Sequence, residues 1–315
     1  MYKHYLVTGG NGFIGTALVQ MLLDEGNRVT VFDNIFRHKR KKFRNIEKLK
    51  FIKGDICNTS QVKKSLKDID VLIHLAYING TKNFYQIPDK IIEVATKGIV
   101  NVFDACIKNE VKEIYLASSS EVYHYPKKIP TDEMTNLIIP DPHNPRYSYG
   151  AGKILTEIYG LNFAKYFKKL IIFRPHNVYG PNMGNEHVIP EITNKILKLK
   201  KGKLNIQGSG NETRSFIYID DFVNSFKILL KRGKHKNIYN IGNKEEVTIN
   251  NIVELISNIL NKKIIIKKGQ LKKGGTPRRC PNIEKIKKIG YKQKYSLNKG
   301  LYETVRWYKL NYEKK

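Results

Sequence analysis

Short apolar runs alternate with longer, helically periodic segments through the first half of this chain. The apolar runs are rich in Ile, Val and Leu, and the segments between them repeat apolar residues with the period of a helix. Strands are expected at 4–10, 28–34, 50–56, 71–77, 113–120 and 169–180, and helices at 14–26, 91–109 and 149–167. Strands and helices that alternate in this way are typical of a parallel sheet covered on both faces. The sequence therefore predicts an α/β fold with a doubly wound parallel sheet.

Pro, Gly and runs of charge interrupt this pattern beyond residue 180. A surface helix is expected at 189–203, a strand followed by a helix at 214–231, and an amphipathic helix at 248–260 with Thr248 or Asn250 near its cap. We therefore expect a smaller C-terminal α/β lobe. The expected division is a domain of 1–178 with a returning segment near 214–242, and a lobe formed by 179–213 and 243–315.

Basic residues dominate the charge of the chain, which has 57 Lys and Arg against 28 Asp and Glu and a formal net charge of +29. Basic runs occur at 38–42, 198–203 and 262–273. Such a field favours anionic partners, among them nucleotides, nucleic acid or a membrane surface. The sequence shows neither the basic stripe with interleaved aromatics nor a known module that nucleic-acid binding usually requires. We therefore favour solvated surface charge plus a basic site for a phosphorylated ligand.

Cysteine usage and the absence of targeting patterns bear on the compartment. No apolar run reaches the ~18 residues of a membrane span, and the N-terminus has no secretory-signal pattern. Cys57, Cys106 and Cys280 are far apart, with no CxxC and no His cluster at zinc spacing. Neither a disulfide framework nor a metal site is expected. These features predict a reduced, cytoplasmic protein.

The stretch TGGNGFIG places Gly9, Gly12 and Gly15 between an expected strand and an expected helix. Glycine lets the backbone turn tightly and approach a pyrophosphate, and the helix N-terminus then offers N–H groups to the phosphates. The strand–turn–helix context makes this loop a stronger signal than its glycines alone. It predicts a dinucleotide site.

Asp33 lies at the end of the second expected strand, where a carboxylate binds the adenosine ribose and repels a 2′-phosphate. This favours NAD over NADP, although Arg37 and Arg40 keep NADP open. Asp55 and Ile56 close the third strand, where the acid is placed to meet the adenine amino group. The alternative for each acid is an ordinary turn residue.

Two further patterns carry candidate chemistry. The run SSSEVY, from Ser118 to Tyr123, follows the fifth strand, and ligands of open α/β sheets bind at those strand ends. Tyr149 and Lys153 lie one helical turn apart on one face of an expected helix. A lysine cation and an oxidised nicotinamide nearby favour the phenolate of a tyrosine whose ordinary pKa is ~10. Tyr149 is then a base for a sugar hydroxyl, with a hydroxyl such as that of Ser119 completing the hydrogen bonding. The alternative is that the pair has no role.

In order along the chain, TGGNGFIG, GDI, HLA, SSSEVY, YGAGK and RPHNVYGP resemble the motifs of the extended short-chain dehydrogenase/reductases. The resemblance is closer to their NAD-dependent nucleotide-sugar epimerase/dehydratase branch, and it covers about residues 3–305. It implies a Rossmann-type fold, a tightly held NAD that is reduced and reoxidised in one turnover, and a nucleoside-diphosphate sugar as substrate. It also implies a dimer formed through the helices at 91–109 and 149–167.

The resemblance also implies roles for residues that match its motifs. Ser119, Tyr149 and Lys153 would form the catalytic trio. Cofactor contacts would come from Gly9, Gly12, Phe13, Ile14, Gly15, Asp33, Asn34, Asp55, Ile56, Leu75, Ala76, Tyr77, Tyr149, Lys153 and Pro175. Substrate contacts would come from Tyr77, Ser119, Ser120, Asn177, Arg214 and Arg278 or Arg279. For the arginines, the alternative is surface charge on a very basic chain.

The residue at position 121 differs between enzymes of this branch that carry out different reactions, and in this chain it is Glu121. Dehydratases and decarboxylases of UDP-glucuronate resemble this chain in carrying Glu there, whereas simple 4-epimerases often carry a small residue. Once C4 is a ketone the C5 proton is acidified, and a carboxylate is placed to remove it. Arg146, in NPRYSY, resembles an arginine of the decarboxylases, and its alternative is an ordinary loop charge. We therefore expect an epimerase or a Glu121-assisted 4,6-dehydratase. A sugar-acid decarboxylase, and a non-catalytic nucleic-acid-binding protein on a reductase fold, are the alternatives.

Several positions depart from the pattern of the branch. Tyr77 stands where a second Ala follows HLA, Ala95 replaces the usual Asn, and His124 replaces the usual Gly. His176, Glu186 and His187 add polar groups near the expected sugar site. These departures suggest a substrate that differs from UDP-glucose.

Overall fold

The computed structural model describes residues 2–36, 42–199, 202–271 and 274–312. It divides into two compact units. The first comprises residues up to His124, Leu137–Pro175 and Phe226–Tyr239, and the second comprises Tyr125–Asn136, His176–Ser225 and Asn240 onward. The domain bounds expected from the sequence differ in detail and stay a prediction.

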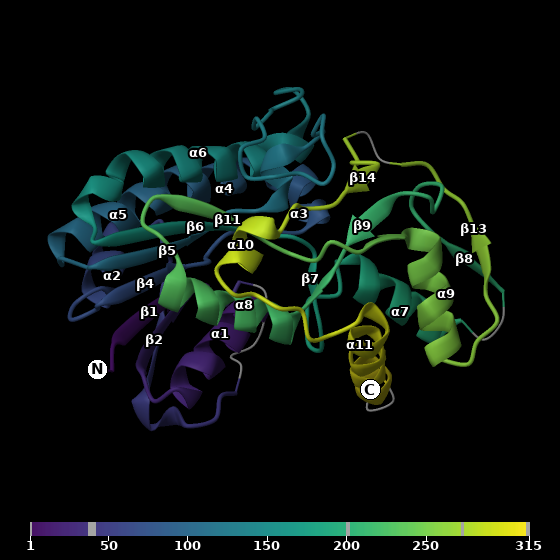
Figure 1. Cartoon of the computed structure of the whole chain (residues 1–315), viewed down its shortest axis with the longest axis horizontal. Helices are drawn as coiled ribbons and strands as arrows, with labels where there is room; N and C mark the ends of the chain where they lie inside the picture. The colour runs from purple at the N-terminus through teal and green to yellow at the C-terminus, as the bar shows by residue number, and fades with distance from the viewer. Residues whose placement is uncertain (1, 37–41, 200–201, 272–273, 313–315) are drawn as a thin grey trace. The chain divides into compact units, whose positions relative to one another are not determined.

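The centre of the first unit is a seven-stranded sheet with the order β11-β6-β5-β4-β1-β2-β3 (Figure 1). Its strands are β1 His4–Thr8, β2 Arg28–Asp33, β3 Leu49–Lys53, β4 Val71–His74, β5 Glu113–Ala117, β6 Lys169–Pro175 and β11 Asn237–Ile241. Every pairing from β6 to β3 is parallel. Successive strands run outward from β1 on one side and from β4 on the other, so the strand order reverses between them. Ligands of such sheets bind at the carboxyl ends of the strands beside this reversal. The predicted doubly wound, Rossmann-type sheet is confirmed.

Helices cover the sheet of the first unit, with α5 and α6 over one face and α1 over the other (Figure 1). The helices are α1 Phe13–Asp24, α2 Thr59–Ser65, α3 Thr81–Gln86, α4 Pro88–Glu93, α5 Ile99–Lys108 and α6 Ser148–Phe163, and α8 Ile219–Arg232 runs from the second unit into the first. Short 3-10 turns occupy η1 Ile46–Lys48, η3 Ser120–Tyr123, η4 Pro145–Tyr147 and η5 Ala164–Tyr166. Apolar residues of α2 and α5 pack against alternate residues of the strands and form a continuous core.

The structure corrects some of the predicted boundaries. The helix expected at 91–109 is α4, a π-helical segment η2 Val94–Gly98, and α5. The strands expected to end at 56, 77 and 120 end three residues earlier, at Lys53, His74 and Ala117. The first residue after each strand still donates to the neighbouring strand, as Leu75 does to Thr8 and Ser118 does to Phe173, and the residues beyond it follow at the carboxyl edge of the sheet.

The second unit contains small sheets and helices. Its strands are β7 Val178–Tyr179, β8 Lys203–Asn205, β9 Thr213–Ser215, β10 Ile217–Tyr218, β12 Glu246–Thr248, β13 Ile265–Lys267 and β14 Arg278–Arg279. They pair as β10-β7, β12-β9-β14 and β13-β8. The helices are α7 Val188–Lys198, α9 Ile249–Ile259, α10 Glu284–Lys288 and α11 Leu297–Tyr312. The Thr248 hydroxyl accepts a hydrogen bond from the Asn251 amide at 3.1 Å, which confirms Thr248 as the cap of α9.

Two features are absent from the part of the chain that the structure describes. None of the described helices is long and apolar enough to cross a membrane. Within the same residues, no group of His, Cys, Asp and Glu is arranged to hold a metal ion.

Candidate active site

The glycine loop lies between β1 and α1, as its sequence context predicts. Gly9 has a φ of 69°, and a Cβ there would lie 2.7 Å from the Ala76 nitrogen. A Cβ on Gly15 would lie 2.7 Å from the Cα of Gly10 and would overlap the Gly9 carbonyl oxygen. Only glycine therefore permits this turn. The first turn of α1 carries no acidic residue, so its N–H groups face no competing carboxylate.

Asp33 holds the glycine loop from the end of β2. Its Oδ2 accepts a hydrogen bond from the Asn11 amide at 3.0 Å, and its Oδ1 accepts one from the Ile35 amide at 2.8 Å. The Asn34 amide side chain donates to Asp55 at 3.1 Å, so both predicted acids lie at one edge of the sheet. A glycine cradle, a helix N-terminus and an acid at the second strand fit a dinucleotide such as NAD. Arg37 and Arg40, which favoured NADP, lie outside the described residues.

The exit of β4 joins the same edge. The amides of Leu75 and Ala76 donate to the Thr8 hydroxyl at 3.2 and 3.3 Å. That hydroxyl also contacts Nδ1 of His74 at 2.8 Å. Burial, followed by the charge of Lys153, lowers the pKa of His74 to about 3, so this histidine is neutral at physiological pH.

Tyr149 and Lys153 both point inward from α6. The Lys153 ammonium donates to the Ala117 carbonyl at 2.8 Å, which ties the helix to the end of β5. The Tyr149 ring is 5% exposed. It stacks on Phe84 with centroids 4.9 Å apart and meets Tyr77 edge-on at 5.2 Å. Burial lowers the pKa of Lys153 from 10.5 to about 7, against the opposing attraction of Glu157. A lysine buried so deeply beside a tyrosine is not a surface residue of the helix.

The depressed pKa of Lys153 predicts a pH-dependent cost to stability. Between the folded pKa of about 7 and the unfolded value of 10.5, the unfolded chain binds one more proton than the folded chain. The free energy of unfolding therefore rises with pH by up to ~1.4 kcal/mol per unit in this window. Lys153→Met lacks this dependence, so its stability relative to the wild type should fall by about 2 kcal/mol from near pH 7 to near pH 9.

Urea unfolding at the two pH values measures this change. Lys63→Met, which removes an exposed lysine on α2, is the matched control and should show the same relative stability at both values. A relative stability of Lys153→Met that does not change with pH would contradict a depressed pKa.

The serine run forms η3 at the end of β5. The Ser119 hydroxyl accepts a hydrogen bond from the Glu121 amide at 3.2 Å and so caps this turn. A Cβ added to Gly150, the neighbour of Tyr149, would lie 3.0 Å from the Glu121 carbonyl oxygen. The glycine therefore lets the first turn of α6 approach η3 closely. The turn that Ser119 caps and that carries Glu121 therefore lies against the first turn of α6, which carries Tyr149.

Glu121 forms an ion pair with Arg146, with 3.0 Å between the carboxylate and Nη2. The Arg146 guanidinium also lies over the Phe84 ring, 4.9 Å from its centroid. The Arg146 amide donates to the Asn144 side chain at 3.0 Å, which holds the short turn η4. Nη1 of Arg146 is buried and has no hydrogen-bond partner among the described residues. A buried donor without an acceptor is costly, which suits a site that binds an anionic group.

Sequence reasoning missed a buried network directly beneath the serine run. The Ser118 hydroxyl donates to Glu157, whose carboxylate pairs with Arg174 at 2.6 Å. Arg174 also donates to the Tyr123 hydroxyl at 2.6 Å. Burial opposes the charge of Arg174, but its hydrogen bonds to Glu157 outweigh burial and raise its pKa. The one available signal was the spacing of Glu157, one helical turn after Lys153.

The remaining predicted cofactor residues, and the predicted substrate residue Ser120, lie at the ends of elements of the first unit. Phe13 and Ile14 begin α1, Ile56 follows β3, and Pro175 ends β6. Ser120 is buried at the start of η3. All of them lie in the first unit, together with the predicted catalytic residues.

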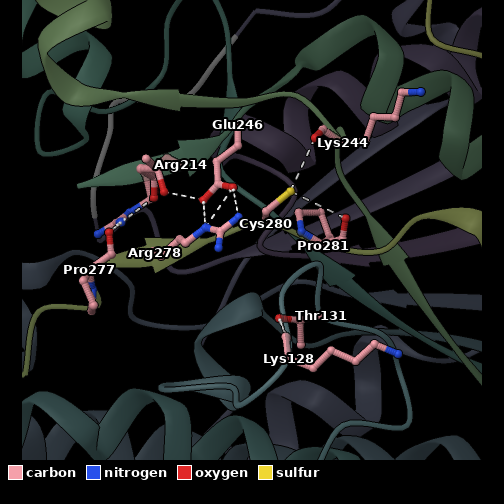
Figure 2. A network of polar contacts seen from close by, with 10 residues as sticks. Lys128, Thr131, Arg214, Lys244, Glu246, Pro277, Arg278, Cys280 and Pro281 are labelled. Atoms are coloured by element: carbon pink, nitrogen blue, oxygen red, sulfur yellow. Dashed lines mark hydrogen bonds and ion pairs between the residues drawn. The ribbon is translucent and has the colours of Figure 1, made fainter. Parts of the chain in front are cut away.

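Three of the predicted substrate contacts, Asn177, Arg214 and Arg278, belong to the second unit. The Arg278 guanidinium forms a two-pronged ion pair with Glu246, with its Nε 2.9 Å from Oε1 and its Nη2 2.9 Å from Oε2 (Figure 2). Arg214 donates to the carbonyls of Thr213 and Thr276, each at 2.7 Å. The strands β9 and β14, which carry these arginines, are paired in one small sheet.

The two other residues predicted to contact substrate in the second unit are Asn177 and Arg279. The side chain of Asn177 donates to the Ser215 carbonyl at 2.8 Å. Arg279, the alternative to Arg278, is buried and donates to the Thr276 hydroxyl at 2.9 Å. The exposed Arg278 is therefore better placed than Arg279 to meet a ligand.

Comparison with known proteins identifies the class to which this fold and site belong. The model of the NAD dependent epimerase/dehydratase family matches residues 5–242, so the chain belongs to this family. The predictions of an enzyme and of NAD as cofactor are confirmed at the level of the family.

Similar individual proteins span several reactions. UDP-N-acetyl-alpha-D-glucosaminuronate decarboxylase of Bacillus cytotoxicus is 29% identical over 98% of both chains. Among solved structures, a UDP-N-acetylglucosamine 4-epimerase from Methanobrevibacter ruminantium in complex with UDP-N-acetylmuramic acid is 29% identical, with a TM-score of 0.88 over 98% of this chain and 99% of that chain. A dTDP-glucose 4,6-dehydratase from Streptomyces venezuelae with NAD bound is 26% identical, with a TM-score of 0.89 over 98% of both chains. Because these relatives differ in reaction, the reaction of this chain must be inferred from its own residues.

Proposed function

We propose that this enzyme oxidises C4 of a nucleoside-diphosphate sugar, with Tyr149 as the base. The observation that carries the proposal is the Tyr149/Lys153 pair, which the hydrogen bond from Lys153 to Ala117 anchors at the carboxyl end of β5. A cation next to a tyrosine favours the phenolate, which takes the proton of the C4 hydroxyl. NAD, when bound, supplies the hydride acceptor. The Ser119 hydroxyl donates a hydrogen bond to the C4 oxygen.

For the second step, we propose removal of the C5 proton by Glu121. The C4 ketone acidifies that proton, because the electron pair left on C5 delocalises onto the ketone oxygen. The C6 hydroxyl, protonated as it leaves, departs as water and leaves a C5–C6 double bond. Return of the hydride to C6 and of a proton to C5 would then give the 4-keto-6-deoxy sugar and restore NAD, which completes the 4,6-dehydration. Glu121 lies against the first turn of α6, and its pairing with Arg146 fixes the direction of its carboxylate. The order of the two steps follows from the need for the ketone.

Arg146 supports a second candidate, a sugar-acid decarboxylase. Its buried Nη1 has no partner among the described residues, and a C6 carboxylate is an acceptor that fits it. In the C4 ketone of a sugar acid, the C5–C6 bond breaks, carbon dioxide leaves, and its electron pair moves to the ketone oxygen. Protonation of C5, followed by return of the hydride to C4 with a proton to the C4 oxygen, would then give the product and restore NAD. This reaction needs a cation for the carboxylate and no C5 base.

Mass spectrometry of products formed in heavy water separates these reactions. UDP-, GDP-, CDP-, ADP- and dTDP-sugars and UDP-sugar acids are offered in parallel with added NAD. We expect loss of water with deuterium incorporated, and we expect Glu121→Gln to lose this product by at least about 100-fold. Loss of carbon dioxide from a sugar acid, impaired by Arg146→Leu more than by Glu121→Gln, would establish the decarboxylase instead. An isobaric product without deuterium would make the enzyme a 4-epimerase and contradict a base role for Glu121.

We also propose that the enzyme is a cytoplasmic homodimer that pairs through α5 and α6. Large apolar side chains on these helices are exposed, among them Val100 and Leu155, each 39% exposed, and Ile158, 53% exposed. Large apolar side chains left exposed on two helices suit an interface between subunits.

Sedimentation tests the dimer. Ile158→Lys should weaken the association at least about tenfold, because it places a charge in the apolar interface. Lys63→Met, on α2, should leave the association unchanged. A wild-type protein that sediments as a monomer would rule the dimer out.

A further inference from the structure

Two positions that depart from the family pattern, Tyr77 and Ala95, meet Gly152 beside the catalytic pair. A Cβ on Gly152 would overlap the Tyr77 hydroxyl and would lie 2.7 Å from the Cβ of Ala95. The small residues at 95 and 152 thus make room for the tyrosine. The Tyr77 hydroxyl is buried and has no hydrogen-bond partner among the described residues. A tyrosine kept there without a partner for its hydroxyl is placed for the sake of its ring.

The ring of Tyr77 touches both members of the catalytic pair. The Lys153 ammonium lies over its face, 3.9 Å from the centroid. Its plane meets the Tyr149 ring at 88°, with centroids 5.2 Å apart. On the far side, Tyr149 stacks on Phe84, over which the Arg146 guanidinium lies. The catalytic tyrosine is therefore held in a line of three aromatic rings with a cation at each end.

We propose that Tyr77 is a positioning residue for the Tyr149/Lys153 pair, whose ring face seats the Lys153 ammonium next to the Tyr149 phenol. The inference deepens the proposed function and rests on it for its catalytic meaning. The geometry itself involves only the first unit of the chain and no bound ligand.

The surroundings of Lys153 show why the ring matters. The charged and titratable groups that act on it are Glu157 on its own helix and the neutral His74 on β4, and the ring of Tyr77 lies beneath its ammonium. The Glu157 carboxylate is already shared by Ser118 and Arg174. Burial favours the neutral amine and lowers the pKa of Lys153 to about 7. The π-face of Tyr77 counteracts this effect of burial on the pKa of Lys153, because a ring quadrupole attracts a cation held within about 6 Å.

The test compares two substitutions that differ only in the ring. Tyr77→Phe keeps the π-face and removes the unpaired hydroxyl. Tyr77→Leu keeps the site apolar and dry but has no π-face. Tyr166→Leu is the matched control, because Lys165 lies over that ring, 5.2 Å from its centroid, on a residue that is 54% exposed.

The titration of Tyr149 is read from tyrosines labelled with carbon-13 at Cζ, in the protein without substrate. Its signal is assigned by its loss in Tyr149→Phe. In Tyr77→Leu, we expect the Tyr149 midpoint to move to higher pH by about 0.5 to 1 unit, because a less charged Lys153 stabilises the phenolate less. In Tyr77→Phe and Tyr166→Leu, it should stay at the wild-type value. Equal midpoints in Tyr77→Leu and Tyr77→Phe would overturn the inference.

A further variant, Tyr77→Met, and a further measurement, the pH dependence of kcat/KM, extend the test of Tyr77. Tyr77→Met fills the same space without a ring and serves if Tyr77→Leu fails to fold; its midpoint should also rise. In turnover, the pH dependence of kcat/KM should shift by the same amount in the ringless variants. Absence of turnover in the wild type, with the midpoint shift intact, would reject the proposed function and leave the positioning role standing. Turnover in the wild type without a midpoint shift in the ringless variants would support the proposed function and reject the positioning role.

Discussion

Tyr149→Phe is expected to abolish turnover, with kcat at least about 100-fold below the wild type. Phe lacks the hydroxyl that takes the C4 proton, while its ring retains the stacking on Phe84 and Tyr77. NAD should remain bound, because the contacts that shape the glycine loop come from β1, β2 and β4. Product formation and the amount of NAD that copurifies with the protein measure the two effects.

Tyr166→Phe is the matched control for this variant. Tyr166 is 54% exposed, in the turn that follows α6, so its loss of a hydroxyl should leave kcat at the wild-type value. If Tyr149→Phe turned over as fast as this control, the proposed base would be wrong. If it lost NAD as well as activity, the hydroxyl would act in cofactor binding rather than in proton transfer.

Arg174→Met is expected to lower the free energy of unfolding by about 3–5 kcal/mol. Arg174 is 1% exposed, and its removal leaves the Glu157 carboxylate buried without its cation. The substitution also takes a donor from the Tyr123 hydroxyl. Urea unfolding at neutral pH measures the loss. Because Glu157 also accepts from Ser118, activity should fall in the same variant.

Two further variants locate the cause of this loss. Lys195→Met removes one partner of the exposed ion pair with Glu191 and should cost less than about 1 kcal/mol. Arg174→Met/Glu157→Leu removes both buried charges and should recover part of the stability lost in the single variant. A single variant no less stable than Lys195→Met would show that the buried pair does not hold this region together.

Local sequence patterns were enough to predict the sheet and the positions of its glycine loop. The alternation of apolar runs with helical periods predicts parallel strands, because strands covered on both faces must be apolar along their length. The same patterns misplace a strand end at His74, because apolar residues continue past it at Leu75 to Tyr77. They also miss the π-helical segment at Val94–Gly98, whose change in hydrogen bonding leaves no mark in the periodicity.

The sequence by itself determined the family, the dinucleotide loop and the Tyr149/Lys153 pair, because each depends on residues close together along the chain. Only the tertiary structure decided what surrounds that pair. Contacts between Glu121 and Arg146, Glu157 and Arg174, and Tyr77 and Lys153 join residues 17 to 76 positions apart. No local periodicity records such contacts, since they form when α6 and the turn before it pack against residues at the carboxyl edge of the sheet. The charge and direction of the catalytic groups depend on these neighbours, because burial and nearby charges act through space rather than along the chain.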